Sequence, residues 1–442
     1  MEASNDLNAL GKTAPDDRSS LLFSMKHMQL HGLLTSERPI EFLTLVEIIM
    51  KKTLLSAVLT CMFATAAHAQ SSVTLYGFID VGLTYVSNQK VAGSTAGHSN
   101  FAMTNASINP DGFGMRGTED LGGGLKAIFT LENGFTLTNG ALGQHGLLFG
   151  RQAFAGLSSD QFGTVTLGRQ YDAMIDYLAP LAAAATSTGG VFFGHPYDND
   201  NLENTMRINN SVKFTSANYK GWQFGSLYGF SNAAGGFSNN RAYSFGTSYN
   251  NGPLRFAASY LQINNGGTAT NLTGATDSYL TSGQVSSSDS TFSAGQQRTF
   301  GAGLNYVFGP ARVGFVYTET KLENATGINN TSSTSIDFAS SSLRFDNYEV
   351  SAHYSLTPEL VLIGSYTFTD GGSSLSGASS PKWNQANLLL DYSLSKRTDV
   401  YVEGQFQHVS GGGTTFTADI NGLAPSANDK QVALTAGLRA RF

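Results

Sequence analysis

This sequence of 442 residues contains a single cysteine, Cys61, and only 10 prolines. Charged residues make up 13% of it, about half the share found in ordinary soluble domains. It has no run of basic residues, and outside residues 50–69 no apolar stretch approaches the length of a membrane-spanning helix. These shortages exclude a disulfide framework, disfavour nucleic-acid binding and leave no candidate for a helical membrane domain.

The one long apolar stretch is MKKTLLSAVLTCMFATAAHA, residues 50–69. It starts with two lysines after Met50, continues with an apolar segment and ends in an A-x-A cleavage pattern, so we interpret it as a secretory signal peptide. The alternative, a short buried helix, does not explain why strand-like sequence follows directly. Residues 1–49 show no clear period, and we expect a misassigned or disordered extension before a start at Met50. The mature domain would then span residues 70–442.

Glycine and aromatic residues are abundant instead, with 50 Gly, 29 Phe and 18 Tyr. From residue 72 onward apolar and polar residues alternate, as in VTLYGFIDVGLTY (residues 73–85) and LKAIFTLE (residues 125–132). A period of two is typical of a strand with one apolar face. We identify sixteen such runs, which begin near residues 73, 108, 124, 147, 162, 206, 220, 240, 253, 298, 311, 343, 360, 383, 398 and 430.

The connections between these runs alternate in length. Short connections such as EDLGGG, NNGP and LTPE are rich in turn-forming residues. Long connections, rich in Ser, Gly, Asn and Thr, cover residues 87–107, 172–205, 264–297, 324–342, 370–382 and 410–428. Short turns at one end and long loops at the other are typical of a transmembrane barrel with an even number of strands. The pattern therefore predicts an all-β protein, a 16-stranded antiparallel transmembrane β-barrel whose size leaves an aqueous lumen.

The chain ends in ALTAGLRARF, with Leu434, Leu438 and Phe442 on one face of the predicted strand and Arg439 and Arg441 on the other. Because a bilayer offers no water to satisfy an open sheet edge, the last strand must pair with the first. We place Phe442 on the lipid face, in the aromatic girdle of the periplasmic rim. We assign Leu438 and Phe442 as a C-terminal assembly signal.

In their order and spacing, several segments resemble the trimeric general porins of Gram-negative outer membranes, of the betaproteobacterial type. These segments are SSVTLYGFIDVGL, GTEDLGGGLKAIFTLE, RQAFAGLSSDQFGTVTLGRQYD, RINNSVKFTS, LSKRTDVYVEGQFQHVSG and GLRARF. The resemblance implies a homotrimer in the cell outer membrane that passes small polar solutes and ions passively. The expected partners are the lipid bilayer, lipopolysaccharide and the outer-membrane assembly machinery, and neither a cofactor nor a nucleic acid nor enzymatic activity is expected.

Residues 172–205 are unusually apolar for a loop and contain the segments LAPLAAAA and VFF. Such a segment needs a surface to bury against, and the inner wall of the barrel is the nearest one. By resemblance this segment is the family's third loop, so we expect an inward-folded constriction loop. The alternative is that it packs over the barrel mouth or on a neighbouring subunit.

The narrowest part of a pore sets selectivity through its width and charge. The loop supplies three acidic residues and strand alternation places four basic residues on the lumen side, so the predicted pore constriction comprises Asp198, Asp200, Glu203, Arg116, Arg151, Arg207 and Lys213. By resemblance, Arg151 and Arg207 match wall arginines of the family, whereas Gly112-Phe113-Gly114 stands where the family has Arg-Phe-Gly. Opposed charges would create a transverse field that orients dipolar solutes and admits ions of both signs. The alternative is that these groups are turn residues and structural ion pairs.

Arg169 breaks the alternation of its strand, because Val165 and Leu167 place it on the outward face. A charge that faces lipid is costly, so we predict that Arg169 has its partner at the trimer interface. The alternative is a bulge that turns the side chain inward.

Three kinds of function compete, namely a passive channel, an adhesin or receptor, and a barrel enzyme. A barrel enzyme needs clustered catalytic side chains and a narrow or plugged barrel, so the strand count favours the channel. The glycine runs at residues 122–124 and 411–413 lack the Lys-Ser/Thr of a phosphate loop, and the histidines lack metal-ligand spacing. We therefore assign no catalytic, cofactor-binding or metal-binding residue, and ion selectivity does not follow from the sequence.

Overall fold

A computed structural model describes residues 72–442, except residues 92–95, 106, 186–188, 267–270, 272, 277–290, 330–335, 377–379 and 414. The predicted extension (residues 1–49) and signal peptide (residues 50–69) lie outside the described residues. The described chain belongs to one compact unit, Ala69–Phe442. None of the helices in this described part has the length and apolar character needed to cross a membrane.

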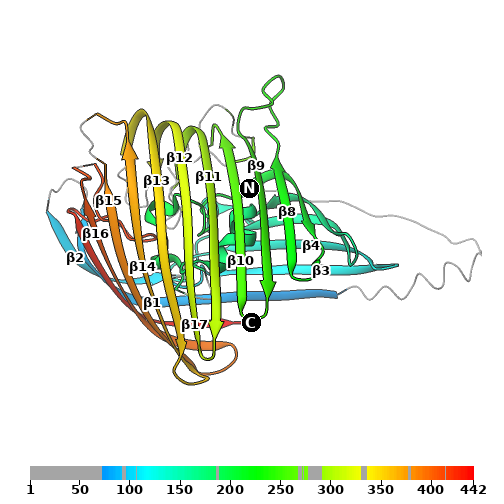
Figure 1. Cartoon of the computed structure of the whole chain (residues 1–442), viewed down its shortest axis with the longest axis horizontal. Coiled ribbons are helices and arrows are strands. Elements are labelled where there is room, and N and C mark those ends of the chain that lie inside the picture. Colours follow the sequence, from blue (N-terminus) through cyan, green and yellow to red (C-terminus); the bar gives the residue numbers. More distant parts are fainter. Residues whose placement is uncertain are drawn as a thin grey trace, which may run out of the picture. The chain divides into compact units, whose positions relative to one another are not determined.

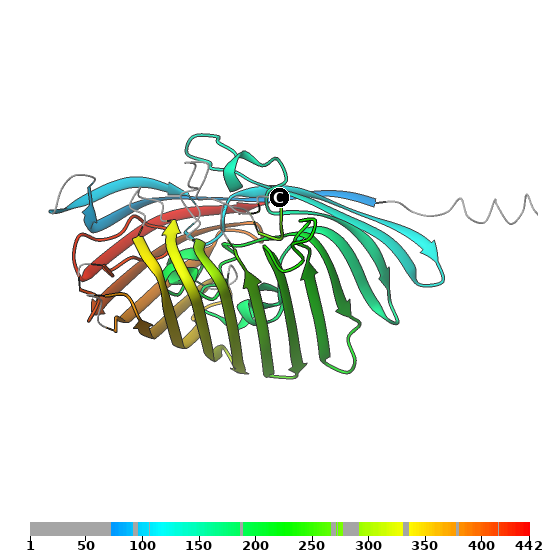
Figure 2. The same ribbon diagram turned by 90° about the horizontal axis from the view of Figure 1, so that it is seen from above.

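The described chain is dominated by one antiparallel sheet that closes on itself (Figures 1 and 2). Its strands are β1 (Ser72–Lys90), β2 (Gly97–Asn105), β3 (Gly112–Gly122), β4 (Leu125–Gly134), β5 (Gln152–Ser159), β6 (Gly163–Gln170), β7 (Ile208–Ser216), β8 (Trp222–Gly229), β9 (Arg241–Asn251), β10 (Leu254–Asn264), β11 (Thr291–Phe308), β12 (Ala311–Asn329), β13 (Ile336–Ser355), β14 (Leu360–Ser373), β15 (Lys382–Ser393), β16 (Thr398–Ser410) and β17 (Lys430–Arg441). From β3 to β17 each strand pairs with the next, and β1 pairs with both β3 and β17. β2 pairs with the second half of β1 and β3 with its first half, so β2 and β3 together occupy one position in the wall. The wall therefore has sixteen strands, which confirms the predicted fold class.

Side chains alternate between the two faces of the wall, as the sequence predicts. In β1, Val73, Leu75 and Leu83 point outward and are 60–67% exposed. The residues of the other parity, such as Asp80 and Thr84, point inward and are buried. The outer surface is therefore apolar and the inner surface polar, which is the arrangement of a barrel wrapped by lipid around a polar interior.

The last strand closes the barrel against the first. β17 pairs with β1 from Phe78↔Arg441 to Val86↔Ala433. Phe442 extends this ladder, because its N–H donates to the Gly77 carbonyl at 3.0 Å and its carbonyl accepts from the Gly77 N–H at 3.1 Å. The Phe442 ring covers Gly77 so closely that an added Cβ would collide with Cζ of the ring. The predicted pairing of the last strand with the first is confirmed.

The second wall strand is interrupted between β2 and β3, where residues 107–111 lie in no strand. The Asp80 carboxylate on β1 satisfies the backbone there, accepting from the N–H groups of Ile108 (3.0 Å) and Asn109 (2.7 Å). The Tyr401 hydroxyl donates to the same carboxylate at 2.5 Å. In return Asp111 accepts the Asp80 N–H at 2.6 Å. Side-chain carboxylates thus replace the ladder bonds that the interruption removes.

Replacing Asp80 with alanine is therefore expected to destabilise the barrel by about 2–5 kcal/mol, because two buried N–H groups and a hydroxyl lose their acceptor. Urea unfolding of the protein in lipid vesicles measures this change. The matched control is Asp160→Ala, which removes an exposed carboxylate paired with Lys126 and should change the unfolding midpoint far less. Equal midpoints for the two variants would contradict the assigned role of Asp80.

Several strands extend beyond their predicted limits. β2 lies within the predicted long connection 87–107, and β11 and β13 begin near residues 291 and 336 rather than near 298 and 343. In the extension of β13 the exposed positions carry small polar side chains such as Ser340 and Ser342. The strand ladder continues there although the apolar alternation has ended, because a strand above the bilayer no longer needs an apolar face.

Candidate functional site

Residues 171–206, which follow β6, are called the inner loop below, and Arg207 stands directly before β7 in the wall. It contains a π-helical turn, η3 (Met174–Leu178), and three short 3-10 helices, η4 (Ala179–Leu181), η5 (Val191–Phe193) and η6 (Pro196–Asp198). The ribbon seen from above places these turns within the ring of strands (Figure 2). Most described side chains of this loop are buried although they lie in no strand.

The first part of the inner loop packs into a recess of glycines on the barrel wall. Tyr177 lies against Gly246 of β9, and Leu178 lies against Gly301 of β11. A Cβ added at either glycine would collide with the opposing side chain. Glycine here creates the space that the loop occupies, so the wall and the loop are complementary in shape.

Replacing Gly301 with valine is expected to lower the free energy of unfolding by about 1–3 kcal/mol, the usual effect of overpacking a filled site. Because the loop is the movable partner, the current through single channels should also become noisier. The matched control is Gly364→Val on β14, where an added Cβ has its nearest neighbours at 3.7 Å. Quiet channels and unchanged stability for Gly301→Val would show that the loop does not depend on this recess.

The far part of the inner loop is held by an aromatic cluster. Tyr197 contacts Phe292, Phe345 and Trp383 from β11, β13 and β15, with ring centroids 6.0–6.5 Å away. All four side chains are buried. Edge-on contacts of this kind stabilise an aromatic cluster beyond the effect of the buried area alone.

A buried histidine joins the inner loop to the wall of β12 and β13. His195 Nδ1 lies 2.6 Å from Asp200 Oδ2, and Nε2 lies 3.2 Å from Glu349 Oε2 on β13. The Thr318 hydroxyl donates to Asp200 at 2.5 Å, and the Ala183 N–H donates to Glu349 at 2.7 Å. Burial alone would lower the pKa of His195, but the two carboxylates outweigh it and raise that pKa well above its usual value. Asp200 is thus part of the attachment of the loop and is fully buried.

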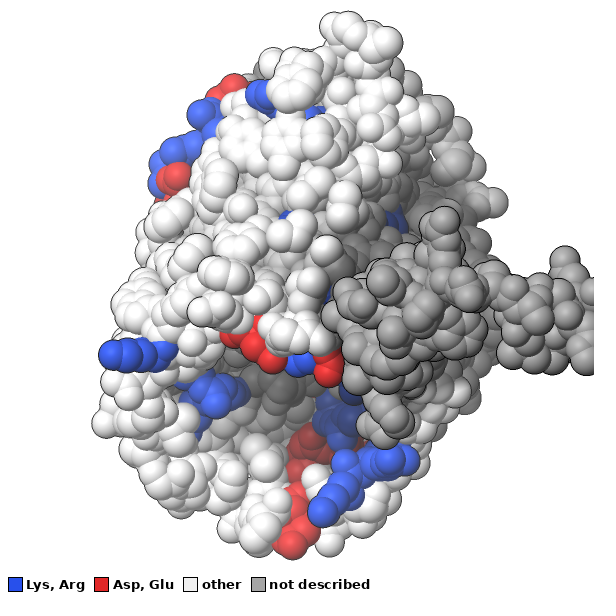
Figure 3. Space-filling view, turned by 90° about the vertical axis from the view of Figure 1, so that its right-hand side faces the viewer, with Lys and Arg blue, Asp and Glu red and all other residues white. Residues whose placement is uncertain are grey.

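A cavity of about 370 Å³ lies between the inner loop and the wall, where Phe78 of β1, Asn109 and Pro110 also line it. Four of its lining residues are charged: Glu132, Arg151 and Arg207 on the wall side, and Glu203 on the loop. Glu203 is half-buried, and burial together with the neighbouring Asp198 carboxylate raises its pKa. The face of the molecule that lies to the right in Figure 1 is hollowed, and acidic and basic side chains gather around the hollow (Figure 3).

Arg151 occupies the space that a side chain at position 112 would need. Its Nη2 donates to the Asp111 carbonyl at 2.8 Å, and its Nη1 lies 3.6 Å from Glu132 Oε1. A Cβ added at Gly112 would lie 2.7 Å from Nη1 of Arg151. The glycine at 112 therefore gives the Arg151 guanidinium its place against the wall.

The other predicted constriction residues lie apart from this cavity lining. Asp198 is buried and accepts the N–H groups of Glu203 and Thr205, both at 2.9 Å, and burial raises its pKa to about 7. Lys213 pairs with Asp176 at 2.8 Å. Arg116 is exposed on β3, with its guanidinium 5.4 Å from the ring centre of Tyr76. The structure thus brings together Arg151, Arg207 and Glu203 of the seven predicted residues.

Two irregularities break the strand alternation near this site. Asn210 has a φ of 50°, and Ile208, which strict alternation places outward, is fully buried within the loop cluster. In β6 the register with β7 shifts between Gly168 and Gln170, with Gly168 at a φ of 141°. Arg169 lies at this bulge, where its Nε donates to the Gly150 carbonyl at 2.7 Å.

Sequence reasoning missed Glu132, His195 and Glu349 as parts of the site. Glu132 and Glu349 stand at inward positions of β4 and β13, and that signal was available. The pairing of His195 with Glu349 joins residues 154 positions apart, which no local pattern contains. Within the described residues, no three His, Cys, Asp or Glu side chains are grouped so that they could hold a metal ion.

Comparison with known proteins gives consistent matches. A family model of Gram-negative porins matches residues 55–412. An outer membrane porin protein of Bordetella pertussis is 33% identical over 387 residues, which cover 81% of this chain and 94% of that protein. Outer membrane porin protein 32 of Delftia acidovorans is 30% identical over 282 residues, which cover 63% of this chain and 72% of that protein.

The solved structures show the same fold. An anion-selective porin from Comamonas acidovorans superposes with a TM-score of 0.62 at 24% sequence identity. The superposition covers 84% of this chain and 100% of that chain. At this identity the likeness supports the barrel architecture and not the position of single side chains.

Proposed function

Because this chain belongs to the Gram-negative porin family, and so forms an outer-membrane channel through which small hydrophilic solutes diffuse passively, we propose that the cavity beside the inner loop is its selective constriction. Arg151 and Arg207 supply positive charge on the wall, and Glu203 supplies negative charge on the loop. Charges of opposite sign across a narrow, low-dielectric passage orient dipolar solutes and lower the barrier for both kinds of ion. Apolar solutes are rejected because they would have to displace ordered water.

The observation that carries this proposal is the attachment of the inner loop to the inward-facing side chains of β9–β15. A loop fixed within the barrel narrows the passage that sixteen strands would otherwise leave wide. Swelling of liposomes that contain the purified protein tests the proposal with neutral sugars of increasing size. Rates should fall steeply with solute size, and rates that do not depend on size would contradict a constriction.

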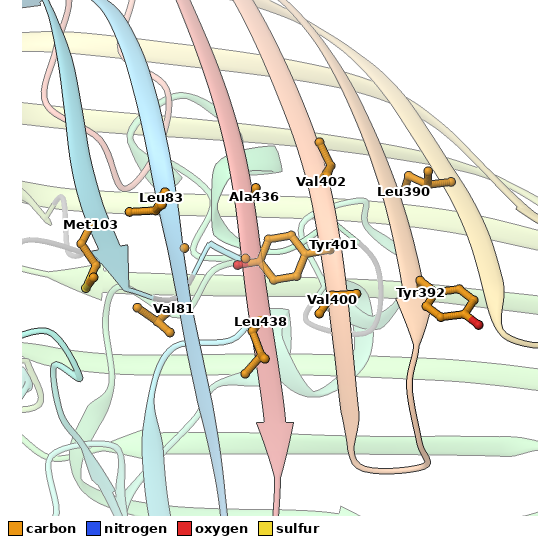
Figure 4. A pocket seen from close by; sticks show the side chains of 12 residues that line it. Val81, Leu83, Met103, Leu390, Tyr392, Val400, Tyr401, Val402, Ala436 and Leu438 are labelled. Atoms are coloured by element: carbon orange, nitrogen blue, oxygen red, sulfur yellow. The ribbon is translucent and has the colours of Figure 1, made fainter.

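A homotrimer fits the outer surface at the barrel seam. A groove there is lined mostly by aliphatic side chains of β1, β2 and β15–β17, among them Leu83, Met103 and Leu438, together with Tyr392 and Tyr401 (Figure 4). Outward positions on β8 and β11–β15 carry many Phe, Tyr and Trp side chains instead. The family matches support a trimer, and we place its contact at this groove because its lining is mostly aliphatic, and such a patch is better suited to another barrel than to the aromatic-rich membrane interface.

Arg169 provides a test of where the subunits meet. Its hydrogen bond to Gly150 lies within its own chain, so the bulge turns at least part of the side chain into its own subunit. If Arg169 also contacts the neighbouring subunit, Arg169→Glu should lower the dissociation temperature of the trimer on gels by roughly 10 °C or more, because a buried cation becomes a buried anion. Trimers of unchanged heat resistance would place the interface elsewhere.

We assign the remaining partners from the membership of this chain in the porin family. The apolar outer surface is covered by the lipid bilayer, with lipopolysaccharide in the outer leaflet, and the outer-membrane assembly machinery reads the C-terminal strand with Leu438 and Phe442. Within this assignment the short turns face the periplasm and the long loops face outward.

A further inference from the structure

The cavity beside the inner loop has two unlike sides. The wall side carries the charged residues Arg151, Arg207 and Glu132. Water and small ions gain nothing from an apolar surface, whereas sites for organic molecules combine an apolar lining with a few placed polar groups. The loop side is apolar, and the residues that form it are called the apolar ledge below: Ile175, Ala179, Pro180, Ala184, Ala185 and Leu202.

The apolar ledge is accessible from the cavity and fixed from behind. Pro180 is exposed and Ala185 is half-buried, so part of their apolar surface is open to a solute. Leu178 fills the glycine recess of the wall, and the Ala183 N–H donates to Glu349 of β13 at 2.7 Å. Because the ledge is already ordered, a solute that lies against it does not have to order it first.

Two of the charged groups are held on one short segment at the end of the ledge. Asp198 accepts the N–H groups of Glu203 and Thr205, both at 2.9 Å, and the Thr205 carbonyl accepts from Nη1 of Arg207 at 3.3 Å. Oε1 of Glu203 has no hydrogen-bond partner among the described residues. A positively charged group in the cavity would favour the charged form of this carboxyl.

The charges that line the cavity are balanced in sign. The guanidinium groups of Arg151 and Arg207 stand with the carboxyl groups of Glu132 and Glu203. Glu132 already accepts the Tyr76 hydroxyl at 2.7 Å and lies 3.6 Å from Arg151. A simple anion or cation therefore meets charges of both signs, whereas a solute with one group of each sign can contact a partner with each group.

We propose that this cavity binds zwitterionic α-amino acids with aliphatic side chains, with the carboxylate at Arg151 and Arg207, the ammonium at Glu203 and the side chain on the apolar ledge. The inference rests on the proposed function of the cavity as the constriction. It predicts a preference that width and charge alone do not produce. An aliphatic side chain gains free energy when it leaves water for the ledge, whereas a polar side chain of similar size loses its hydration there.

Block of the single-channel KCl current tests the proposal on the whole protein in a planar bilayer. Leucine is compared with glutamine, which has a polar side chain of similar size, and with 4-methylpentanoate and isoamylamine, which lack the ammonium and the carboxylate respectively. We expect leucine to halve the current at a concentration at least about fivefold lower than any other probe, as partial burial of one aliphatic side chain implies. Equal values for leucine and glutamine, or stronger block by 4-methylpentanoate, would overturn the proposal.

A combined substitution locates the side-chain contact. The ledge variant carries Ile175→Thr, Pro180→Ser and Ala185→Ser, and its matched control carries Leu148→Thr, Ala141→Ser and Ala234→Ser at exposed positions outside the cavity lining. The ledge variant should lose the preference for leucine over glutamine, and the control should keep it. A preference that survives in the ledge variant would refute the assigned role of the ledge.

Glu203→Gln locates the ammonium contact. It should weaken the block by leucine about fivefold and leave the block by 4-methylpentanoate unchanged or stronger, because only leucine carries the ammonium. Equal weakening for both probes would contradict the contact. The KCl conductance and the size dependence of sugar fluxes are recorded for every protein. A size-selective wild-type channel without a leucine preference refutes the amino-acid site alone, whereas a wild-type channel without size dependence refutes the constriction itself.

Discussion

Deletion of Phe442 is expected to reduce the yield of folded barrel at least tenfold. The deletion removes both hydrogen bonds to Gly77 at the seam and the aromatic ring that covers this glycine. The two hydrogen bonds and the ring together contribute about 3 kcal/mol to the free energy of folding. Lipid cannot hydrogen-bond the Gly77 N–H and carbonyl groups that the deletion leaves without a partner. The measurement is the fraction of protein that migrates as folded barrel on unheated gels after refolding into vesicles.

Two further variants separate the ring from the backbone. Phe442→Tyr keeps both the hydrogen bonds and the ring, and its yield should match that of the wild type. Gly77→Val keeps the backbone pairing but collides with the ring, so its yield should fall between the other two. A normal yield after deletion of Phe442 would mean that closure of the barrel does not depend on the last residue.

Replacing Glu203 with glutamine and Arg207 with glutamine is expected to shift the reversal potential in opposite directions. Both residues line the same cavity, one on the loop and one on the wall. Loss of the carboxylate should favour anions and loss of the guanidinium should favour cations, each by roughly threefold in permeability ratio, because a charge at the narrowest level acts with little screening. The potential is measured across a planar bilayer in a tenfold KCl gradient.

The pH dependence provides an internal control for the Glu203 variant. Because burial raises the pKa of Glu203, acidification neutralises this carboxyl earlier than an exposed one. The selectivity of the wild type should therefore approach that of Glu203→Gln as the pH falls, while the variant itself changes less. Arg116→Gln, at an exposed position outside the cavity lining, should leave the potential nearly unchanged. If both substitutions in the cavity shift the potential in the same direction, the transverse arrangement of charge is wrong.

The architecture was predictable because every strand that crosses the membrane must present apolar side chains to the lipid and polar side chains to the interior. Alternation of apolar and polar residues located all sixteen wall strands, and the same rule placed Phe442 at the seam. The prediction of strand limits failed above the bilayer, where a strand no longer needs an apolar outward face. β2 and the outer parts of β11 and β13 escaped detection because their outward side chains are not consistently apolar.

The site was only partly predictable, for a different reason. Alternation and resemblance together found Arg151, Arg207 and Glu203, which the structure brings to one cavity. Asp200 and Asp198 share the acidic character that suggested a pore lining, but their burial depends on contacts with His195 and with the loop backbone. Those contacts are set by how the inner loop packs on distant strands, and no spacing along the chain records them.

Single-channel recording in a planar lipid bilayer tests the central claim most directly, namely that the closed sheet encloses a water-filled passage narrowed by the inner loop. Addition of the purified protein should produce discrete current steps that are linear with voltage and that grow in proportion to the conductivity of the bathing salt. A protein that inserts into the bilayer without producing such steps would contradict the account.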